Sequence, residues 1–165
     1  MKYSDRELTR LAARVGRHLC ATGRTVVTAE SCTGGWIAKA LTDIAGSSQW
    51  FVEGFVTYSN EAKRRRLGVA HSILELQGAV SEAAVRAMAT GALQRTGAQL
   101  AVAVSGIAGP GGAAQDKPVG TVWICWAQRR GTKLRVIARV AHFRGNREAV
   151  RRKTVGEALA GLLKR

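Results

Sequence analysis

Three polar segments of the sequence carry the residue types that could do chemistry: 28–35, 57–63 and 105–112. Each lies where a predicted strand ends. In an open α/β sheet, ligands bind in the crevice outside the carboxyl ends of the strands. We therefore expect the three segments to converge at one edge of a sheet and to form one site there.

The first segment offers Ser31 as a nucleophile. This serine precedes a predicted helix, where unpaired backbone N–H groups near Thr33, Gly34 and Gly35 would point outward and could hold an oxyanion. Two glycines are costly in a helix, which indicates that the backbone must approach something closely. The alternative is that Ser31 or Thr33 only caps the helix. Cys32 is a rival nucleophile, because a helix start lowers the pKa of a thiol, but it has no candidate histidine beside it.

A serine nucleophile needs a base, and the second segment supplies Lys63. His18 lies inside the first predicted helix, and His71 and His142 lack an acidic neighbour, so none of the three suits a Ser/His/Asp system. A lysine can serve as base once burial and neighbouring positive charge lower its pKa. Three arginines follow Lys63 directly, and the positive end of a helix capped by Asn60 would add to the effect. The alternative is a solvated basic helix face.

Tyr58 lies five residues before Lys63 and could relay a proton between the lysine and the reaction centre. The residues between them include Ser59 and Asn60, which are candidate contacts for a substrate. Cys32, beside the nucleophile, is a further candidate contact.

The third segment has the small residues and free N–H groups of an anion-binding loop. Its candidate contacts are Ser105, Gly106, Gly109 and Gly111. The segment lacks the Gly-Lys-Ser/Thr ending of a nucleotide-triphosphatase loop, so the alternative is a flexible turn between strands.

Cysteine and histidine usage gives no sign of a metal or a cofactor. Cys20, Cys32 and Cys125 form no C-x-x-C pair, and the chain has no H-E-x-x-H motif or carboxylate cluster. Charged residues throughout the first twenty positions argue against a signal peptide. The apolar runs are shorter than the ~20 residues that span a bilayer. We expect a cytoplasmic protein, without metal or cofactor, that does not enter a membrane.

Positive charge is the unusual feature of the composition. The chain has 26 Lys and Arg against 11 Asp and Glu, a formal net charge of +15. Residues 129–165 contain twelve basic residues, with Glu148 and Glu157 as their acids. Such a surface can bind nucleic acid through its phosphates. Grooves for single strands also need aromatic residues, and this stretch has Phe143 alone. Nucleic-acid binding is therefore possible but not favoured.

The residues that position the three segments alternate between helical and strand patterns along one domain, residues 1–165. The length allows a core that needs no disulfide. The patterns predict a helix from the capping box Ser4-x-x-Glu7 to Gly23, a strand at 25–29, a helix at 34–44, a strand at 51–58, a helix from Asn60 to Gly68, a helix from Ser81 to Gly97, strands at 100–104, 121–127 and 134–140, and a final helix capped by Asn146. We predict a three-layer α/β/α sandwich with a mostly parallel, mixed sheet of about five strands, in which the last two strands form a hairpin.

Several ordered blocks of sequence carry a resemblance to a known family. They are T-A-E-S-C-T-G-G from residue 28, G-S-S from 46, Y-S-N-E-A-K from 58, L-G-V from 67, G-A-V-S-E from 78, S-G-I-A-G-P-G-G from 105, K-P-V-G-T-V from 117 and F-R-G-N-R-E-A-V-R from 143. The sequence resembles the CinA C-terminal domain family of competence/damage-inducible proteins. It departs from the family pattern at Ser105, at Asn146 and in residues 113–116.

The resemblance implies an α/β/α sandwich and metal-free hydrolysis of nicotinamide mononucleotide to nicotinate mononucleotide and ammonia, in pyridine nucleotide salvage. It also implies a catalytic serine, lysine and tyrosine, which fall on Ser31, Lys63 and Tyr58, and a homo-oligomer. Our hypothesis is an amidohydrolase with Ser31 as nucleophile, and the loop at 105–112 would hold the substrate phosphate. The alternative is a non-enzymatic nucleic-acid-binding or competence/DNA-damage accessory protein.

Overall fold

The computed structural model of the protein describes residues 3–114 and 116–165. Its elements follow one another as α1 (Asp5–Thr22), β1 (Val26–Glu30), α2 (Trp36–Thr42), the 3₁₀ turn η1 (Ser47–Gln49), β2 (Phe51–Val56), α3 (Asn60–Leu67), α4 (His71–Leu76), α5 (Glu82–Thr96), β3 (Leu100–Gly106), β4 (Thr121–Arg130), β5 (Lys133–His142) and α6 (Arg147–Leu162).

The five strands form one mixed sheet in the order β2-β1-β3-β4-β5. β1 pairs in parallel with both β2 and β3, whereas β4 is antiparallel to β3 and to β5. Four of the five strands therefore run in the same direction. The late hairpin is confirmed, since β4 and β5 pair along their whole length from Thr121–His142 to Arg130–Lys133.

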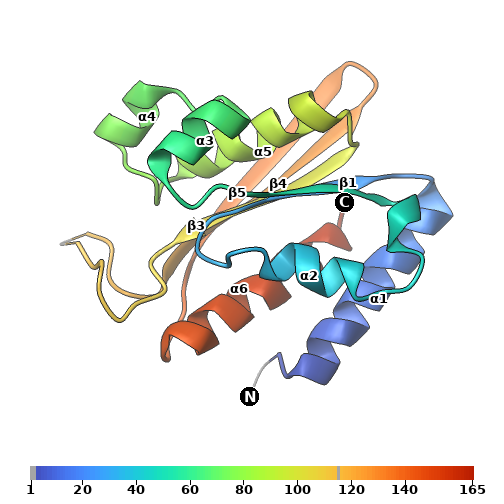
Figure 1. Cartoon of the computed structure of the whole chain (residues 1–165), viewed down its shortest axis with the longest axis horizontal. Coiled ribbons are helices and arrows are strands. Elements are labelled where there is room, and N and C mark those ends of the chain that lie inside the picture. Colours follow the sequence, from blue (N-terminus) through green and yellow to red (C-terminus); the bar gives the residue numbers. More distant parts are fainter. Residues whose placement is uncertain (1–2, 115) are drawn as a thin grey trace.

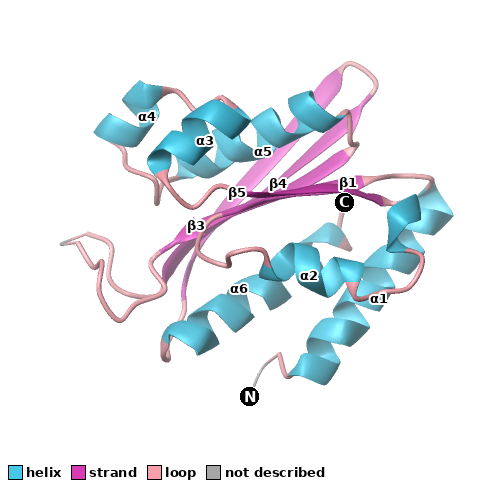
Figure 2. Cartoon of the chain, viewed as in Figure 1, coloured by secondary structure: helices cyan, strands magenta, loops and turns pink. Residues whose placement is uncertain are grey.

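Helices cover both faces of the sheet, so the molecule has three layers (Figures 1 and 2). The helices α1, α2 and α6 lie on one face, and α3, α4 and α5 lie on the other. Because both faces are covered, β1 is buried at all five positions instead of at alternate ones. The predicted fold class is confirmed.

Capping residues fix where the long helices begin. The side chains of Ser4 and Glu7 form the reciprocal capping box at the start of α1, and Ser81 and Asn146 accept backbone hydrogen bonds at the starts of α5 and α6. These three predictions are confirmed. The prediction for Asn60 is wrong: Ser59 caps α3, and Asn60 is the first helical residue.

Two further predictions about the helices are wrong. Three helices follow β2 instead of two, because the short α4 forms without a side-chain cap that would mark it in the sequence. Within α4, His71 Nε2 lies 2.9 Å from Glu75 Oε1, so this exposed histidine does have an acidic neighbour. None of the helices in the described part of the chain is long and apolar enough to cross a membrane.

Candidate active site

The segments that follow β1 and β2 meet at the carboxyl ends of the parallel strands, as predicted. The Ser31 N–H donates to the Val104 carbonyl of β3 at 3.1 Å, and the Thr57 N–H donates to the Glu30 carbonyl of β1 at 2.8 Å. These bonds continue the sheet by one residue beyond β1 and β2. Figure 1 shows the chain leaving β1, entering α3 and leaving β3 at the same end of the sheet.

Ser31 and Lys63 form the central contact of this site. The Lys63 Nζ atom lies 3.0 Å from Ser31 Oγ, 2.9 Å from the Thr57 carbonyl oxygen and 3.3 Å from the Tyr58 carbonyl oxygen. The side chain is almost completely buried, with 1% of its surface exposed. Among the described residues no carboxylate pairs with Lys63. A buried lysine whose neighbours are neutral oxygens is suited to lose its proton.

Burial lowers the pKa of Lys63 below its ordinary value. The three arginines that follow it in sequence are exposed on the outer side of α3, whereas Lys63 and Leu67, one turn apart, face inward. The basic run is thus split between a solvated face and one buried lysine. Lys63 also lies in the first turn of α3, where the unpaired N–H groups of the helix favour its neutral form.

Glu30 is a buried carboxylate that the sequence analysis did not single out. Its two oxygens accept hydrogen bonds from Thr33 Oγ1 at 2.6 Å and from the backbone N–H groups of Gly35, Ile37 and Ala38 at 3.1, 3.0 and 2.8 Å. The carboxylate therefore caps α2 and fixes the loop that carries Ser31. An acidic residue just before a predicted helix start was the signal that could have found it.

The expectation that Gly34 and Gly35 offer free N–H groups is wrong. The Gly34 N–H donates to the Ser31 carbonyl at 3.0 Å, and the Gly35 N–H donates to Glu30. Both glycines have a positive φ, 60° and 92°, which explains their presence in this turn. Within the described chain, the N–H groups of Cys32 and Thr33 have no acceptor. These two, next to Ser31, are the candidate oxyanion donors.

Cys32 is buried and does not have the character of a nucleophile. Burial, assisted by the negative charge of Glu30, raises the pKa of the Cys32 thiol to about 12. A thiol with so high a pKa is protonated at neutral pH and is a poor nucleophile. The geometry therefore favours Ser31.

The Tyr58 side chain lies at the surface, with 59% of its area exposed. Its hydroxyl accepts a hydrogen bond from Arg147 Nη2 at 2.8 Å, while its backbone carbonyl accepts from Lys63. The structure thus links Tyr58 to Lys63 through the backbone, and the hydroxyl itself contacts Arg147.

Two arginines at the start of α6 complete the surroundings of the site. Arg147 Nη1 donates to the Gly109 carbonyl at 2.8 Å, so one guanidinium connects the third segment with Tyr58. Arg151 donates to the carbonyls of Cys32 and Thr33 at 3.1 and 2.8 Å. The sequence placed these arginines in a basic helix but gave no indication that they reach the loop after β1.

The predicted anion-binding loop is only partly free. Ser105 and Gly106 belong to β3 and pair with Trp123 and Val122. A Cβ on Gly106 would come within 2.6 Å of Val122 Cγ2, so this glycine is required by packing. Gly109 is buried, whereas Gly111 is exposed. Ser59, another predicted contact, uses its hydroxyl to cap α3.

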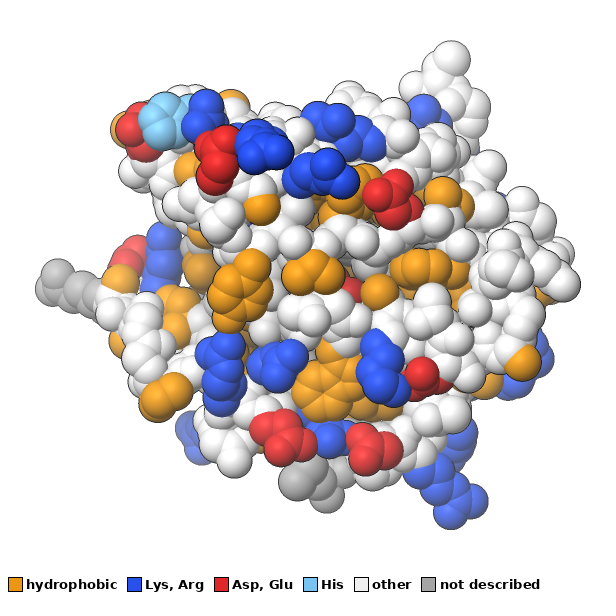
Figure 3. Space-filling view, viewed as in Figure 1, with side chains coloured by type: hydrophobic (Ala, Val, Ile, Leu, Met, Phe, Trp, Pro, Cys, Tyr) orange, Lys and Arg blue, Asp and Glu red, His pale blue; other side chains and the backbone are white. Residues whose placement is uncertain are grey.

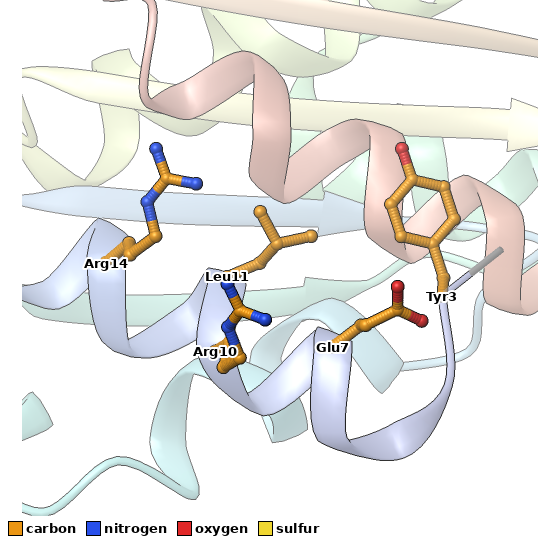
Figure 4. Close-up of a pocket in the computed structure, with 5 residues that line it drawn as sticks. All are labelled: Tyr3, Glu7, Arg10, Leu11 and Arg14. Carbon is orange, nitrogen blue, oxygen red and sulfur yellow. The ribbon is translucent and has the colours of Figure 1, made fainter.

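Open space lies beside the loop that follows Ser31. A pocket of about 500 Å³ is lined by Asp5, Gly34, Gly35, Trp36, Lys39 and Arg151. A smaller hollow of about 200 Å³ lies along α1 (Figure 4) and shares no lining residue with it. No group of three or more metal-ligating side chains occurs in residues 3–114 and 116–165.

The structure is an α/β/α sandwich with a buried serine–lysine pair at the carboxyl edge of its sheet. The sequence pattern of the CinA C-terminal domain matches residues 8–165, and the chain belongs to that family. Relatives that are 53–56% identical to it are named nicotinamide-nucleotide amidohydrolases, and the chain is an amidohydrolase.

Named relatives and solved structures agree with this assignment. The chain is 55% identical over 159 residues to the nicotinamide-nucleotide amidohydrolase PncC of Escherichia coli K12, covering 96% of this chain and 94% of that protein. It is 53% identical to the protein of the same name from Pseudomonas putida, covering 94% and 95%. The crystal structure of the competence/damage-inducible protein CihA from Agrobacterium tumefaciens superposes with a TM-score of 0.91 at 46% identity, covering 96% of both chains.

Proposed function

We propose that the protein hydrolyses the carboxamide of nicotinamide mononucleotide, giving nicotinate mononucleotide and ammonia, with Ser31 as nucleophile. The observation that carries the proposal is the 3.0 Å contact between Ser31 Oγ and the buried Nζ of Lys63. The names of the relatives supply the substrate, and the pair supplies a means of attacking an amide without a metal.

The reaction begins with neutral Lys63, which accepts the proton of the Ser31 hydroxyl as Oγ attacks the amide carbon. The carbonyl oxygen becomes an oxyanion, which the N–H groups of Cys32 and Thr33 stabilise. The lysine ammonium then gives its proton to the amide nitrogen, ammonia leaves, and an ester with Ser31 remains. A water molecule, deprotonated by Lys63, hydrolyses this ester and restores the serine.

Tyr58 and Arg147 act at the outer side of the site in this proposal. Tyr58 relays a proton to the leaving nitrogen once its exposed side chain turns toward Ser31. Arg147 lies between Tyr58 and Gly109, so it is the basic residue best placed to assist the 105–112 loop in holding the substrate phosphate.

The test is ammonia release from nicotinamide mononucleotide by the wild-type protein and by matched variants of adjacent residues. Ser31→Ala should lose activity by several orders of magnitude, whereas Cys32→Ala should retain most of it. The far-UV circular dichroism spectrum of both variants should match wild type. An active Ser31→Ala protein together with an inactive Cys32→Ala protein would move the nucleophile to the thiol.

A second comparison tests the phosphate contact. Nicotinamide riboside lacks the phosphate and should be a poor substrate, with a kcat/KM reduced by about tenfold or more, because a charge-assisted hydrogen bond contributes about 1.5–3 kcal/mol. Equal values for riboside and mononucleotide would remove the phosphate role of Arg147 and the 105–112 loop.

We also propose that the protein is a cytoplasmic homo-oligomer. The edge strand β2 carries exposed Val52 and Val56 and offers a surface through which a second copy could pack. Light scattering coupled to size-exclusion chromatography measures the mass directly, and a monomer at micromolar concentration would contradict this proposal.

A further inference from the structure

A second basic region lies at the end of the sheet opposite Ser31. It surrounds the tip of the β4–β5 hairpin, which projects from the far end of the sheet in Figure 1. Its members come from the end of α1, the hairpin and the end of α6. We call Arg24, Arg130, Lys133, Arg135 and Arg165 the hairpin cluster.

Strand register places the three hairpin members on one face. Arg130 pairs with Lys133, and Arg135 pairs with Gln128. Side chains alternate along a strand, so these residues share the face of Trp126, whose indole donates to the Ala158 carbonyl of α6. This is the face on which α1 and α6 end. Arg130, Lys133 and Arg135 are all exposed.

Contacts join the cluster into one patch. The Gln128 side-chain amide is oriented so that both its oxygen and its nitrogen have suitable partners. In this orientation its oxygen accepts hydrogen bonds from Arg24 Nη1 at 2.6 Å and from Arg130 Nε at 3.0 Å. Arg24 Nη1 also donates to the Arg165 backbone oxygen at 3.1 Å. The guanidinium of Arg165 lies 5.3 Å from the centre of the Trp126 ring.

Among the described residues, the cluster differs from Arg64, Arg86, Arg139 and Arg152 in having no side-chain carboxylate partner. Arg64, Arg86 and Arg139 each form an ion pair with a glutamate. No Asp or Glu side chain of residues 3–114 and 116–165 pairs with any member of the cluster. In addition, the Nε atom of Arg165 is buried without a hydrogen-bond partner.

Charge repulsion within the patch supports the same conclusion. Burial lowers the pKa of Arg24, and the nearby positive charge of Arg130 lowers it further. Burial likewise lowers the pKa of Arg165, and the charge of Arg135 adds to the effect. The charged guanidinium groups are therefore held close together at a cost in free energy. A bound anion would offset that repulsion.

We propose that the hairpin cluster binds the phosphodiester backbone of duplex nucleic acid without reading its sequence. A projecting patch with the exposed cations Arg130, Lys133 and Arg135 fits a chain of phosphates, and a net charge of +15 attracts a polyanion from a distance. Single strands are disfavoured because they require exposed aromatic surfaces for stacking. Trp126, the aromatic residue at the patch, is only 5% exposed.

This binding is independent of the amide hydrolysis proposed above. Figure 3 shows further Lys and Arg side chains over α3 and over α6 on another part of the surface, so the test must separate the cluster from overall charge. Arg10 and Arg14 supply the control, because they lie together on α1 beside the hollow drawn in Figure 4, and neither belongs to the cluster.

The experiment measures fluorescence anisotropy of labelled 20-base-pair duplexes of two unrelated DNA sequences, the matching RNA duplex and the single strands, between 50 and 200 mM NaCl. The double variant R130A/R135A should bind both DNA duplexes about 10- to 100-fold more weakly at 100 mM salt. It should also reduce the slope of log K against log salt by about 2, because each lost phosphate contact contributes about 0.9. The comparison with the RNA duplex shows whether the protein binds the phosphodiester backbone of DNA, of RNA or of both.

R10A/R14A removes the same charge and should change the affinity by less than about threefold, since it leaves the cluster intact. Both double variants should keep the melting temperature and the rate of ammonia release. Equal losses of affinity in the two double variants would overturn the proposal, because binding would then follow net charge alone. Tighter binding of single strands, or binding of tripolyphosphate but of no duplex, would also overturn it.

Discussion

Replacing Lys63 by arginine separates its two possible roles, that of a proton acceptor and that of a fixed positive charge. Arginine keeps the charge and much of the stem, but with a pKa above ~12 it cannot lose a proton at neutral pH. If Lys63 deprotonates Ser31, Lys63→Arg should be nearly as inactive as Lys63→Ala.

The magnitude follows from the geometry of the site. A positioned general base contributes about 10²–10⁴-fold to the rate, so kcat/KM should fall by at least about 100-fold. The Nζ atom of Lys63 has three oxygens between 2.9 and 3.3 Å away, which leaves little room for a larger guanidinium. Lys63→Met is therefore the companion variant, because methionine has a similar length, carries no charge and can occupy the same buried space.

The pH dependence provides the second measurement. Because burial lowers the pKa of Lys63, the wild-type rate should rise with pH along a limb set by that pKa, below the ordinary lysine value of ~10.4. The Met variant should lose this limb.

The free energy of unfolding should also rise with pH. The unfolded chain binds more protons than the folded one between the folded and unfolded pKa values of Lys63, so the free energy of unfolding rises with pH across that window. Relative to Lys63→Met, wild type should gain at most about 1.4 kcal/mol per pH unit there, measured by urea denaturation.

Near-normal activity of Lys63→Arg with an unchanged pH profile would refute this reasoning. The lysine would then be an electrostatic or structural residue, and Ser31 would need another base. The stability prediction has its own test. If the free energy of unfolding of Lys63→Met rises with pH as steeply as that of wild type, groups other than Lys63 cause the pH dependence.

Two other predictions concern the residues that position the pair. Glu30→Gln should destabilise the protein by about 1–3 kcal/mol in urea denaturation, because one of the donors bonded to Glu30 would face an amide NH₂ group; unchanged stability and activity would remove Glu30 from its capping role. Gly91→Ala should destabilise α5 against α3, since a Cβ on Gly91 would overlap the Leu67 carbonyl oxygen. The overlap should cost about 1–3 kcal/mol or more, against a gain of about 1 kcal/mol in helix propensity. A net increase in melting temperature would contradict the packing argument.

Local patterns in the sequence were sufficient to predict the elements that hold the site. A short strand pattern at 25–29 identified β1, a continuous apolar run at 100–104 identified β3, and capping residues located the starts of α1, α5 and α6. These signals depend on residues a few positions apart. The six-residue α4 has no side-chain cap and only one buried residue, Leu74, so its local signal was too weak to predict.

Contacts between distant residues were predictable only where strand order determined them. The 32-residue separation of Ser31 and Lys63 is bridged because β1 and β2 are adjacent and parallel, so the segments after both strands must end at the same edge. No such rule brings Arg147 or Arg151 to the site. They reach it because α6 packs beside α2 on one face of the sheet, which is a consequence of tertiary packing.

The buried position of Lys63 also explains why its neighbouring arginines misled the sequence analysis. A run of four basic residues indicates repulsion along the chain, yet a helix turns successive side chains by about 100°. The arginines therefore point to water, which screens their charge, and burial is what lowers the pKa of Lys63. The same rotation that places Lys63 opposite Ser31 keeps the arginines on the exposed side of α3. The contact between Lys63 and Ser31 thus depends on how α3 packs against the sheet. Any change that shifts α3 should alter this contact and the pKa of Lys63 together.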